Sequence, residues 1–114
     1  MPHFVVDCSR TILQFHTEEE IIQRVHHAAN SSTLFDEGDI KVRVNPYRIS
    51  SVGNAPDAFI HVFASIMEGR STLEKSDLSK RLVSELVSMF PQVPNIAMNV
   101  DEFEKATYCN RAML

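Results

Sequence analysis

The sequence predicts an α/β (α+β) fold in which two βαβ units form a four-stranded sheet with two helices on one face. Short runs with period-2 alternation flank two longer segments whose apolar residues recur every three or four positions. The resulting order is strand, helix, strand, and then the same again. Each βαβ crossover makes a parallel strand pair with its helix on one face of the sheet. A length of 114 residues fits one domain covering residues 1–114.

The first βαβ unit begins with a strand predicted at residues 3–8, where β-branched and aromatic side chains alternate. Both faces of this run are fairly apolar, which favours a central or covered strand. Residues 9–16 form a connector, after which Thr17 and Glu20 have capping-box spacing and open a helix. Polar turn-forming residues end this helix within 30–33. Its predicted buried stripe consists of Ile21, Val25, Ala28 and Ala29.

The second strand is predicted at residues 40–45, with apolar residues on one face and Lys41 and Arg43 on the other. We expect Pro46 to stop this strand, because proline cannot donate to the ladder. Residues 52–57 contain Gly, Asn and Pro and form a turn-rich connection within the domain. The run 58–67 is the most apolar of the chain and predicts a central strand.

The second helix is predicted to open at Ser71 and to end at Pro91. Ser71 and Glu74 repeat the capping-box spacing, and apolar residues follow at helical intervals. A last strand covers residues 96–103, before a polar tail. With both helices on one side, the apolar residues on the other face of the first and third strands lack cover, which predicts oligomerisation. The stripe of the second helix consists of Leu78, Leu82, Leu86 and Met89.

Composition and charge exclude several classes of function. The 11 basic and 15 acidic residues are interspersed and give a net charge of −4, so neither nucleic acid nor an anionic membrane is an expected partner. With no apolar run of spanning length and no signal segment, we expect a soluble, cytoplasmic protein. Cys8 and Cys109 lie far apart, which argues against a disulfide scaffold or a zinc site. His26 and His27 lack the i, i+4 spacing of a metal-binding pair.

Pro2 is the first candidate for chemistry. Removal of Met1 would leave Pro2 with a free secondary amine on a rigid ring, a base that burial and neighbouring charges can tune. If Met1 stays, that nitrogen is an amide without useful basicity. The alternative interpretation is structural, because proline is tolerated at the first position of a strand.

A family resemblance joins these features. Pro2-His3-Phe4-Val5-Val6-Asp7-Cys8-Ser9, the paired βαβ units and the turn Gly69-Arg70-Ser71 before the second helix resemble the 5-carboxymethyl-2-hydroxymuconate isomerase family of the tautomerase superfamily. The resemblance implies a homotrimer, Pro2 as the catalytic acid/base, and no metal or organic cofactor. It also implies a dicarboxylic 2-hydroxymuconate-type dienol from aromatic catabolism, which the enzyme isomerises to the unsaturated ketone.

The implied chemistry needs cations beside the base. An amine near neutrality can take a proton from an enol and return it at carbon. Guanidinium groups hold carboxylates and stabilise enolate charge, so Arg70, at the family's turn arginine, is assigned to substrate binding. In the second strand the family has two arginines separated by one residue, whereas this chain has Lys41-Val42-Arg43. Lys41 keeps the charge of the substrate-binding arginine without its planar fork, and Arg43 is the second candidate.

Two other functions stay open. Another tautomerase, of the phenylpyruvate or oxaloacetate type, is consistent with altered carboxylate recognition at Lys41. A trimeric binding module that keeps the fold without the reaction is consistent with a retained Met1.

Overall fold

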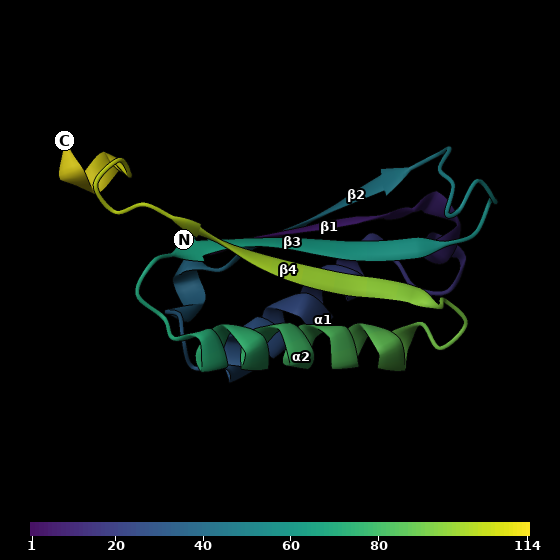
Figure 1. Cartoon of the computed structure of the whole chain (residues 1–114), viewed down its shortest axis with the longest axis horizontal. Coiled ribbons are helices and arrows are strands. Elements are labelled where there is room, and N and C mark those ends of the chain that lie inside the picture. Colours follow the sequence, from purple (N-terminus) through teal and green to yellow (C-terminus); the bar gives the residue numbers. More distant parts are fainter.

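The computed structural model describes residues 1–114 and shows a mixed four-stranded sheet with both helices packed on one face (Figure 1). The strands are β1 (His3–Ser9), β2 (Lys41–Tyr47), β3 (Phe59–Met67) and β4 (Asn95–Phe103), and the helices are α1 (Glu18–Ser31) and α2 (Thr72–Met89). The sheet order is β2-β1-β3-β4. β1 runs parallel to β2 and β3 to β4, whereas β1 and β3 are antiparallel. The predicted pair of βαβ units is therefore confirmed.

The core lies between the sheet and the two helices. Alternate residues of β1 and β3 are fully buried, and the predicted helical stripes pack against them. Both helices begin with the predicted capping boxes, at Thr17 with Glu20 and at Ser71 with Glu74. Short 3₁₀ turns at Arg10–Gln14 and Glu37–Asp39 lie in the connections, and a third at Arg111–Met113 lies in the C-terminal segment after β4.

The expectation that Pro46 ends the second strand is wrong, because β2 continues through Pro46 to Tyr47. β2 is an edge strand, and the Lys41 N–H donates to the Pro2 carbonyl at 3.1 Å. Alternation along the strand then turns the N–H groups of odd-numbered residues toward β1 and the nitrogen of Pro46 toward the open edge. Proline is tolerated there because no ladder hydrogen bond is lost.

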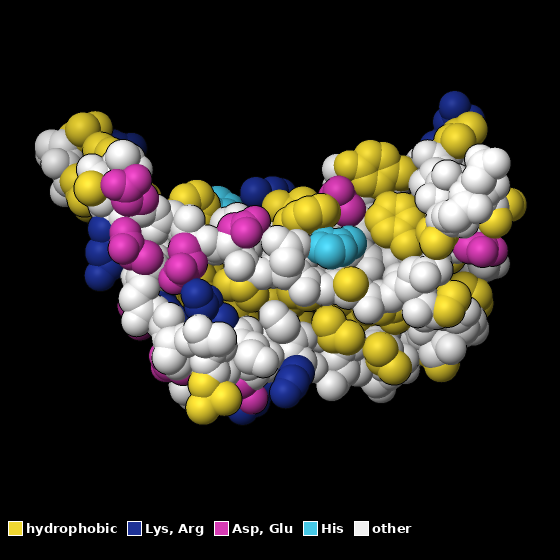
Figure 2. All heavy atoms as spheres, in the orientation of Figure 1, with side chains coloured by type: hydrophobic (Ala, Val, Ile, Leu, Met, Phe, Trp, Pro, Cys, Tyr) yellow, Lys and Arg dark blue, Asp and Glu magenta, His cyan; other side chains and the backbone are white.

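The sheet face opposite the helices is open and hollowed. Figure 2 shows this concave face between two projections, which Figure 1 identifies as the C-terminal segment and the loop after β2. That loop carries a tight two-residue turn, in which Gly53 and Asn54 both have positive φ and Val52 and Ala55 exchange backbone hydrogen bonds of 2.8 and 3.0 Å. Phe63 at the centre of β3 remains 44% exposed. The open face predicted from the apolar residues on both sides of the central strands is thus present.

Candidate functional site

Pro2 directly precedes β1 and is buried. Its carbonyl oxygen accepts the Lys41 N–H, which fixes the entry of the chain into the sheet beside the edge strand. Met1 precedes it and is partly buried, so the Pro2 nitrogen is part of a peptide bond in this structure. A Pro2 amine freed by loss of Met1 would lie at this buried strand end.

Two cationic side chains flank this end of the sheet. Lys41 and Arg43 are exposed on β2 and share the open face of the sheet, as their alternation predicts. The Lys41 ammonium donates to the backbone carbonyl of Asp39 at 2.8 Å. Arg43 Nη1 lies 3.1 Å from His3 Nδ1, which accepts the hydrogen bond.

The local electrostatics disfavour any further positive charge. Burial lowers the pKa of the Met1 amine, and the hydrogen bond and charge of Lys41 lower it further, against an opposing effect of Asp39. Burial also lowers the pKa of His3, with added effects from Arg43, Lys41 and the terminal amine. Burial and the nearby positive charges therefore favour the neutral form of an amine at the start of β1.

Arg70 follows β3 and occupies the same end of the sheet. Its Nη2 donates to the carbonyl of Leu34 at 2.6 Å and its Nη1 to the carbonyl of Met67 at 3.3 Å. The guanidinium lies over the Phe35 ring, 5.1 Å from the centroid, and Phe35 makes an edge contact with Phe4 of β1. Arg70 is thus held on the backbone and an aromatic ring, with two of its donors already satisfied.

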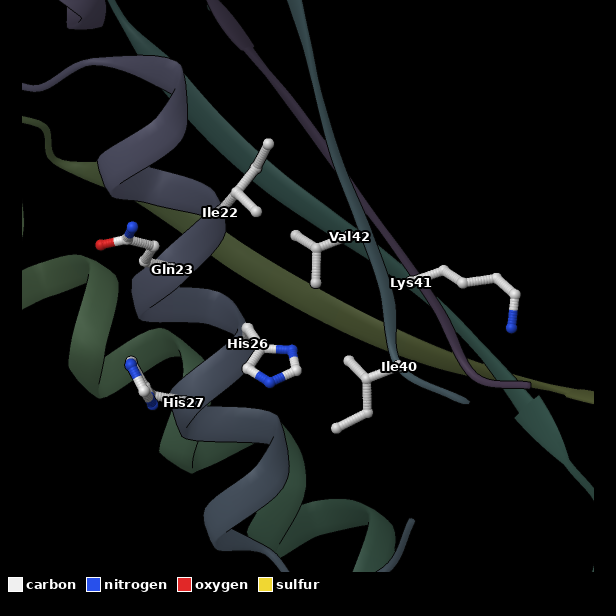
Figure 3. Close-up of a pocket in the computed structure, with 7 residues that line it drawn as sticks. All are labelled: Ile22, Gln23, His26, His27, Ile40, Lys41 and Val42. Carbon is white, nitrogen blue, oxygen red and sulfur yellow. The ribbon is translucent and has the colours of Figure 1, made fainter. Parts of the chain in front are cut away.

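A cavity of about 460 Å³ forms a groove between α1 and β2. Figure 3 shows Ile22 and His26 of α1 facing Ile40 and Val42, whereas the Lys41 side chain points away from the helix. His26 also contacts Glu37 through Nε2 at 2.8 Å. The groove borders the candidate site through Lys41, but Pro2 does not line it.

The structure brings the four sequence candidates to one end of the sheet in two groups. Pro2, Lys41 and Arg43 lie along the parallel β1–β2 pair, whereas Arg70 packs on Phe35, which contacts the buried Phe4 on the side of the sheet that the helices cover. Sequence reasoning missed Phe35 as the support of Arg70, because nothing in a loop sequence predicts which ring a distant guanidinium will contact. His3, which was not among the sequence candidates, also lies at this site, because the register of the β1–β2 pair places it directly beside Lys41.

The chain offers no group of three or more His, Cys, Asp or Glu side chains arranged to hold a metal ion. Neither helix has the length and apolar character needed to cross a bilayer.

Comparisons with known proteins support the fold and give the family. Residues 2–112 match the family model of 5-carboxymethyl-2-hydroxymuconate isomerase. No curated protein matches the chain. A 5-carboxymethyl-2-hydroxymuconate isomerase from Deinococcus radiodurans R1 has a similar structure, with a TM-score of 0.84, 21% identity, and coverage of 96% of this chain and 88% of that one.

Two further structures share the fold at lower identity. A macrophage migration inhibitory factor-like protein from Entamoeba histolytica has a TM-score of 0.74 and 15% identity, over 96% of this chain and 94% of that one. A protein described as a fused 4-OT wild-type asymmetric trimer has a TM-score of 0.79 and 15% identity, over 96% and 92% of the two chains. The fold is therefore that of the tautomerases, and the match over residues 2–112 shows that this chain belongs to the 5-carboxymethyl-2-hydroxymuconate isomerase family.

Proposed function

We propose that this protein is a cofactor-independent tautomerase that isomerises 5-carboxymethyl-2-hydroxymuconate-type dienols, with the amine of Pro2 as acid and base after removal of Met1. The observation that carries the proposal is the buried position of Pro2 beside Lys41, in a chain of this isomerase family. Burial and the neighbouring ammonium both favour a neutral amine, which is the form a general base needs.

The proton transfer needs no group besides the amine and the cations. The neutral amine takes the proton of the dienol hydroxyl, and the electron pair of that O–H bond stays on oxygen as a dienolate. The resulting ammonium returns the proton to carbon, which gives the unsaturated ketone and restores the base. Lys41 and Arg43 supply positive charge on the adjacent face, where they would hold a substrate carboxylate or stabilise the dienolate.

The contacts of Arg70 favour a second candidate. Two of its donors are bound to the carbonyls of Leu34 and Met67, which leaves fewer of them for a substrate carboxylate. A tautomerase of the phenylpyruvate or oxaloacetate type, whose substrates differ in number and placement of carboxylates, is consistent with this arrangement. Assays on 2-hydroxymuconates, phenylpyruvate and oxaloacetate in parallel distinguish the two.

We further propose that the protein assembles as a homotrimer through the open face of the sheet. The concave surface of Figure 2 and the half-exposed Phe63 support burial against further copies. A fused 4-OT structure with the same fold is described as an asymmetric trimer. Light scattering coupled to size-exclusion chromatography measures the assembly directly.

The decisive test of the base is Pro2→Ala, made in protein whose mass shows that Met1 has been removed. We expect a loss of dienol ketonisation by about two to four orders of magnitude, the usual contribution of a general acid or base. Circular dichroism and oligomer mass should stay unchanged. Near wild-type turnover, or protein from its native cell that keeps Met1, would exclude Pro2 from the mechanism and favour a binding module.

A further inference from the structure

Two arginines at the opposite end of the sheet have no partner. Arg24, Arg43, Arg70 and Arg81 each make a hydrogen bond or an ion pair through the guanidinium. The side chains of the remaining three, Arg10, Arg48 and Arg111, make neither. Arg10 and Arg48 nevertheless line the same cavity, although they are far apart in the sequence.

The fold holds these two arginines side by side through buried contacts. Arg10 directly follows Ser9, the last residue of β1, whose side chain is only 4% exposed. Ser9 Oγ accepts the Phe59 N–H at 3.0 Å and lies 3.2 Å from Ser50 Oγ, which ties the end of β1 to the segment that follows Arg48. Ile12, which is fully buried, anchors the 3₁₀ turn that carries Arg10. The two guanidinium groups therefore sit on fixed backbone.

The space between them suits a small ligand. One cavity of about 350 Å³ is lined by Arg10, Thr11, Gln14 and Arg48, and every one of these side chains can donate a hydrogen bond. An adjoining cavity of about 250 Å³ shares Arg10, Thr11 and Arg48. Its lining also includes Ser9, Ser50 and Asp57. Asp57 is the one acidic residue that lines either cavity, so the two arginines outnumber it and the site has positive charge.

We propose that Arg10 and Arg48 form a binding site for a small oxyanion. Phosphate and carboxylate groups both fit this description, because each offers a pair of oxygens that a guanidinium can bind in a bidentate manner. Two neighbouring guanidinium groups repel each other. An oxyanion between them would accept charge-assisted hydrogen bonds from the N–H groups of both. Thr11 and Gln14 supply neutral donors at the same wall. In a chain of net charge −4, placing two arginines together without an acidic partner for each favours an external anion.

The site is separate from the candidate active site and does not depend on the proposed function. Pro2 stands at the beginning of β1 and Arg10 just past its end, so seven strand residues, roughly 23 Å, lie between them. The proposed substrate-binding residues Lys41 and Arg70 lie at the Pro2 end. Loss of anion binding at Arg10 and loss of isomerase activity at Pro2 are therefore separable results.

The test is titration of the full-length protein with sodium phosphate and, separately, with sodium succinate, followed by NMR chemical shifts at ionic strength held constant with chloride. We expect saturable shifts at residues 9–14 and 47–50 with at least one of the two anions. Arg10→Gln and Arg48→Gln should each weaken binding about tenfold, whereas Arg48→Lys should weaken it less because it keeps the charge. Arg111→Gln, which removes an equally unpaired arginine elsewhere, is the matched control.

The two anions distinguish the ligand classes, since tighter binding of phosphate indicates a phosphoryl group and tighter binding of succinate a carboxylate. The proposal is wrong if neither anion gives saturable shifts, or if Arg111→Gln weakens binding as much as the other variants do. It is also wrong if Arg10→Gln or Arg48→Gln changes the oligomeric state while the wild-type protein binds no free anion. In that case an acidic side chain of another copy would be the partner of the two arginines.

Discussion

Lys41 of β2 adjoins Pro2, and its position bears on the proposed base as well as on the proposed substrate contact. Its N–H donates to the Pro2 carbonyl, and its ammonium adds to the effect of burial in lowering the pKa of the Met1 amine. A lysine at this position keeps the charge that acts on the amine but cannot bind a carboxylate through a planar fork. A lysine in place of the arginine that the family resemblance implies would therefore affect carboxylate recognition more than the pKa of the proposed base.

Lys41→Gln in Met1-processed protein should move the acid limb of the kcat/KM pH profile to higher pH. Removal of the ammonium raises the pKa of the Pro2 amine, so a higher pH is needed to keep the base neutral. Lys41→Arg should keep the wild-type profile. Lys80→Gln, at an exposed position of α2, controls for the loss of one positive charge. An unchanged profile in Lys41→Gln would remove Lys41 from the environment of the base.

Arg70→Ala should affect both stability and substrate use. Loss of its two hydrogen bonds leaves the carbonyls of Leu34 and Met67 without this donor and removes the contact with Phe35, which we expect to lower the free energy of unfolding by about 1–3 kcal/mol. Urea denaturation measures this change. If Arg70 also binds substrate, kcat/KM should fall more for a dicarboxylate than for an enol without the matching carboxylate. Equal losses on both substrates would leave Arg70 with a structural role alone.

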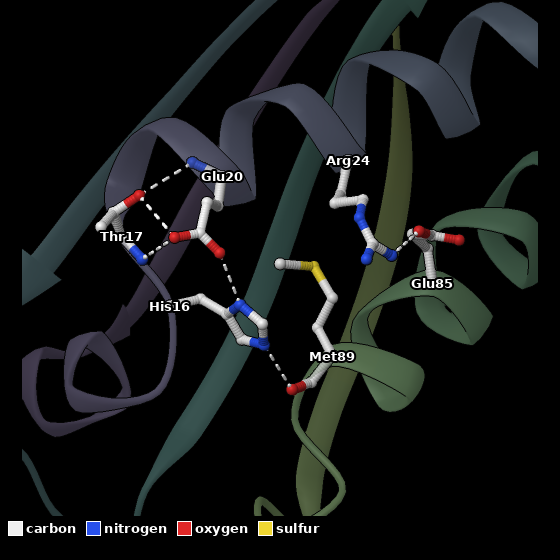
Figure 4. Close-up of polar contacts among 6 residues, drawn as sticks. All are labelled: His16, Thr17, Glu20, Arg24, Glu85 and Met89. Carbon is white, nitrogen blue, oxygen red and sulfur yellow. Dashed lines mark hydrogen bonds and ion pairs between the residues drawn. The ribbon is translucent and has the colours of Figure 1, made fainter.

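At the level of the elements, His16 connects the start of α1 to the end of α2 (Figure 4). Its Nδ1 lies 2.8 Å from Glu20 Oε2 and its Nε2 lies 3.0 Å from the carbonyl oxygen of Met89. Glu20 also closes the capping box with Thr17, and Arg24 pairs with Glu85 one turn further along. The two helices are thus joined by polar contacts outside the apolar core, and a single carboxylate serves both the cap and the link.

Glu20→Gln should lower the thermal midpoint by a few degrees at neutral pH and make little difference at pH values below the range where glutamate titrates. The hydrogen bond from His16, and then that from the Thr17 backbone, lower the pKa of Glu20. A carboxyl whose pKa is lowered by folding stabilises the native state above its unfolded pKa, and this contribution is lost as the pH falls through the folded value. Glu19→Gln, an exposed neighbour without such contacts, is the control. A difference between wild type and Glu20→Gln that does not shrink in acid would contradict this assignment.

For the whole molecule, the open sheet face is the surface most in need of a partner. The helices cover one face, and the other stays concave with Phe63 exposed at its centre. Its remaining side chains are mostly polar or charged and are paired across strands, as in the bonds of Asn45 and Tyr47 to Asp7. Such a surface suits a specific assembly of folded copies.

Phe63→Glu should shift the proposed trimer to monomer, since a carboxylate buried in the proposed interface without a partner is costly. Light scattering coupled to chromatography measures the mass. Val87→Glu on α2 introduces the same charge at a similarly exposed apolar residue, 49% against 44%, and should leave the mass unchanged. A Phe63→Glu protein that stays trimeric would place the interface elsewhere.

Local patterns in the sequence are sufficient to predict the elements and their pairing into two βαβ units. Capping boxes and apolar stripes are local signals, and they were enough to locate α1 and α2 within a residue or two. The extent of β2 was decided by tertiary structure, because only an edge position lets Pro46 continue a strand. The same holds for the contacts of Arg70 with Leu34 and Phe35, and for the placing of Arg10 and Arg48 at one cavity. These contacts join segments more than thirty residues apart, and no periodicity within either segment encodes which distant backbone or side chain it will meet.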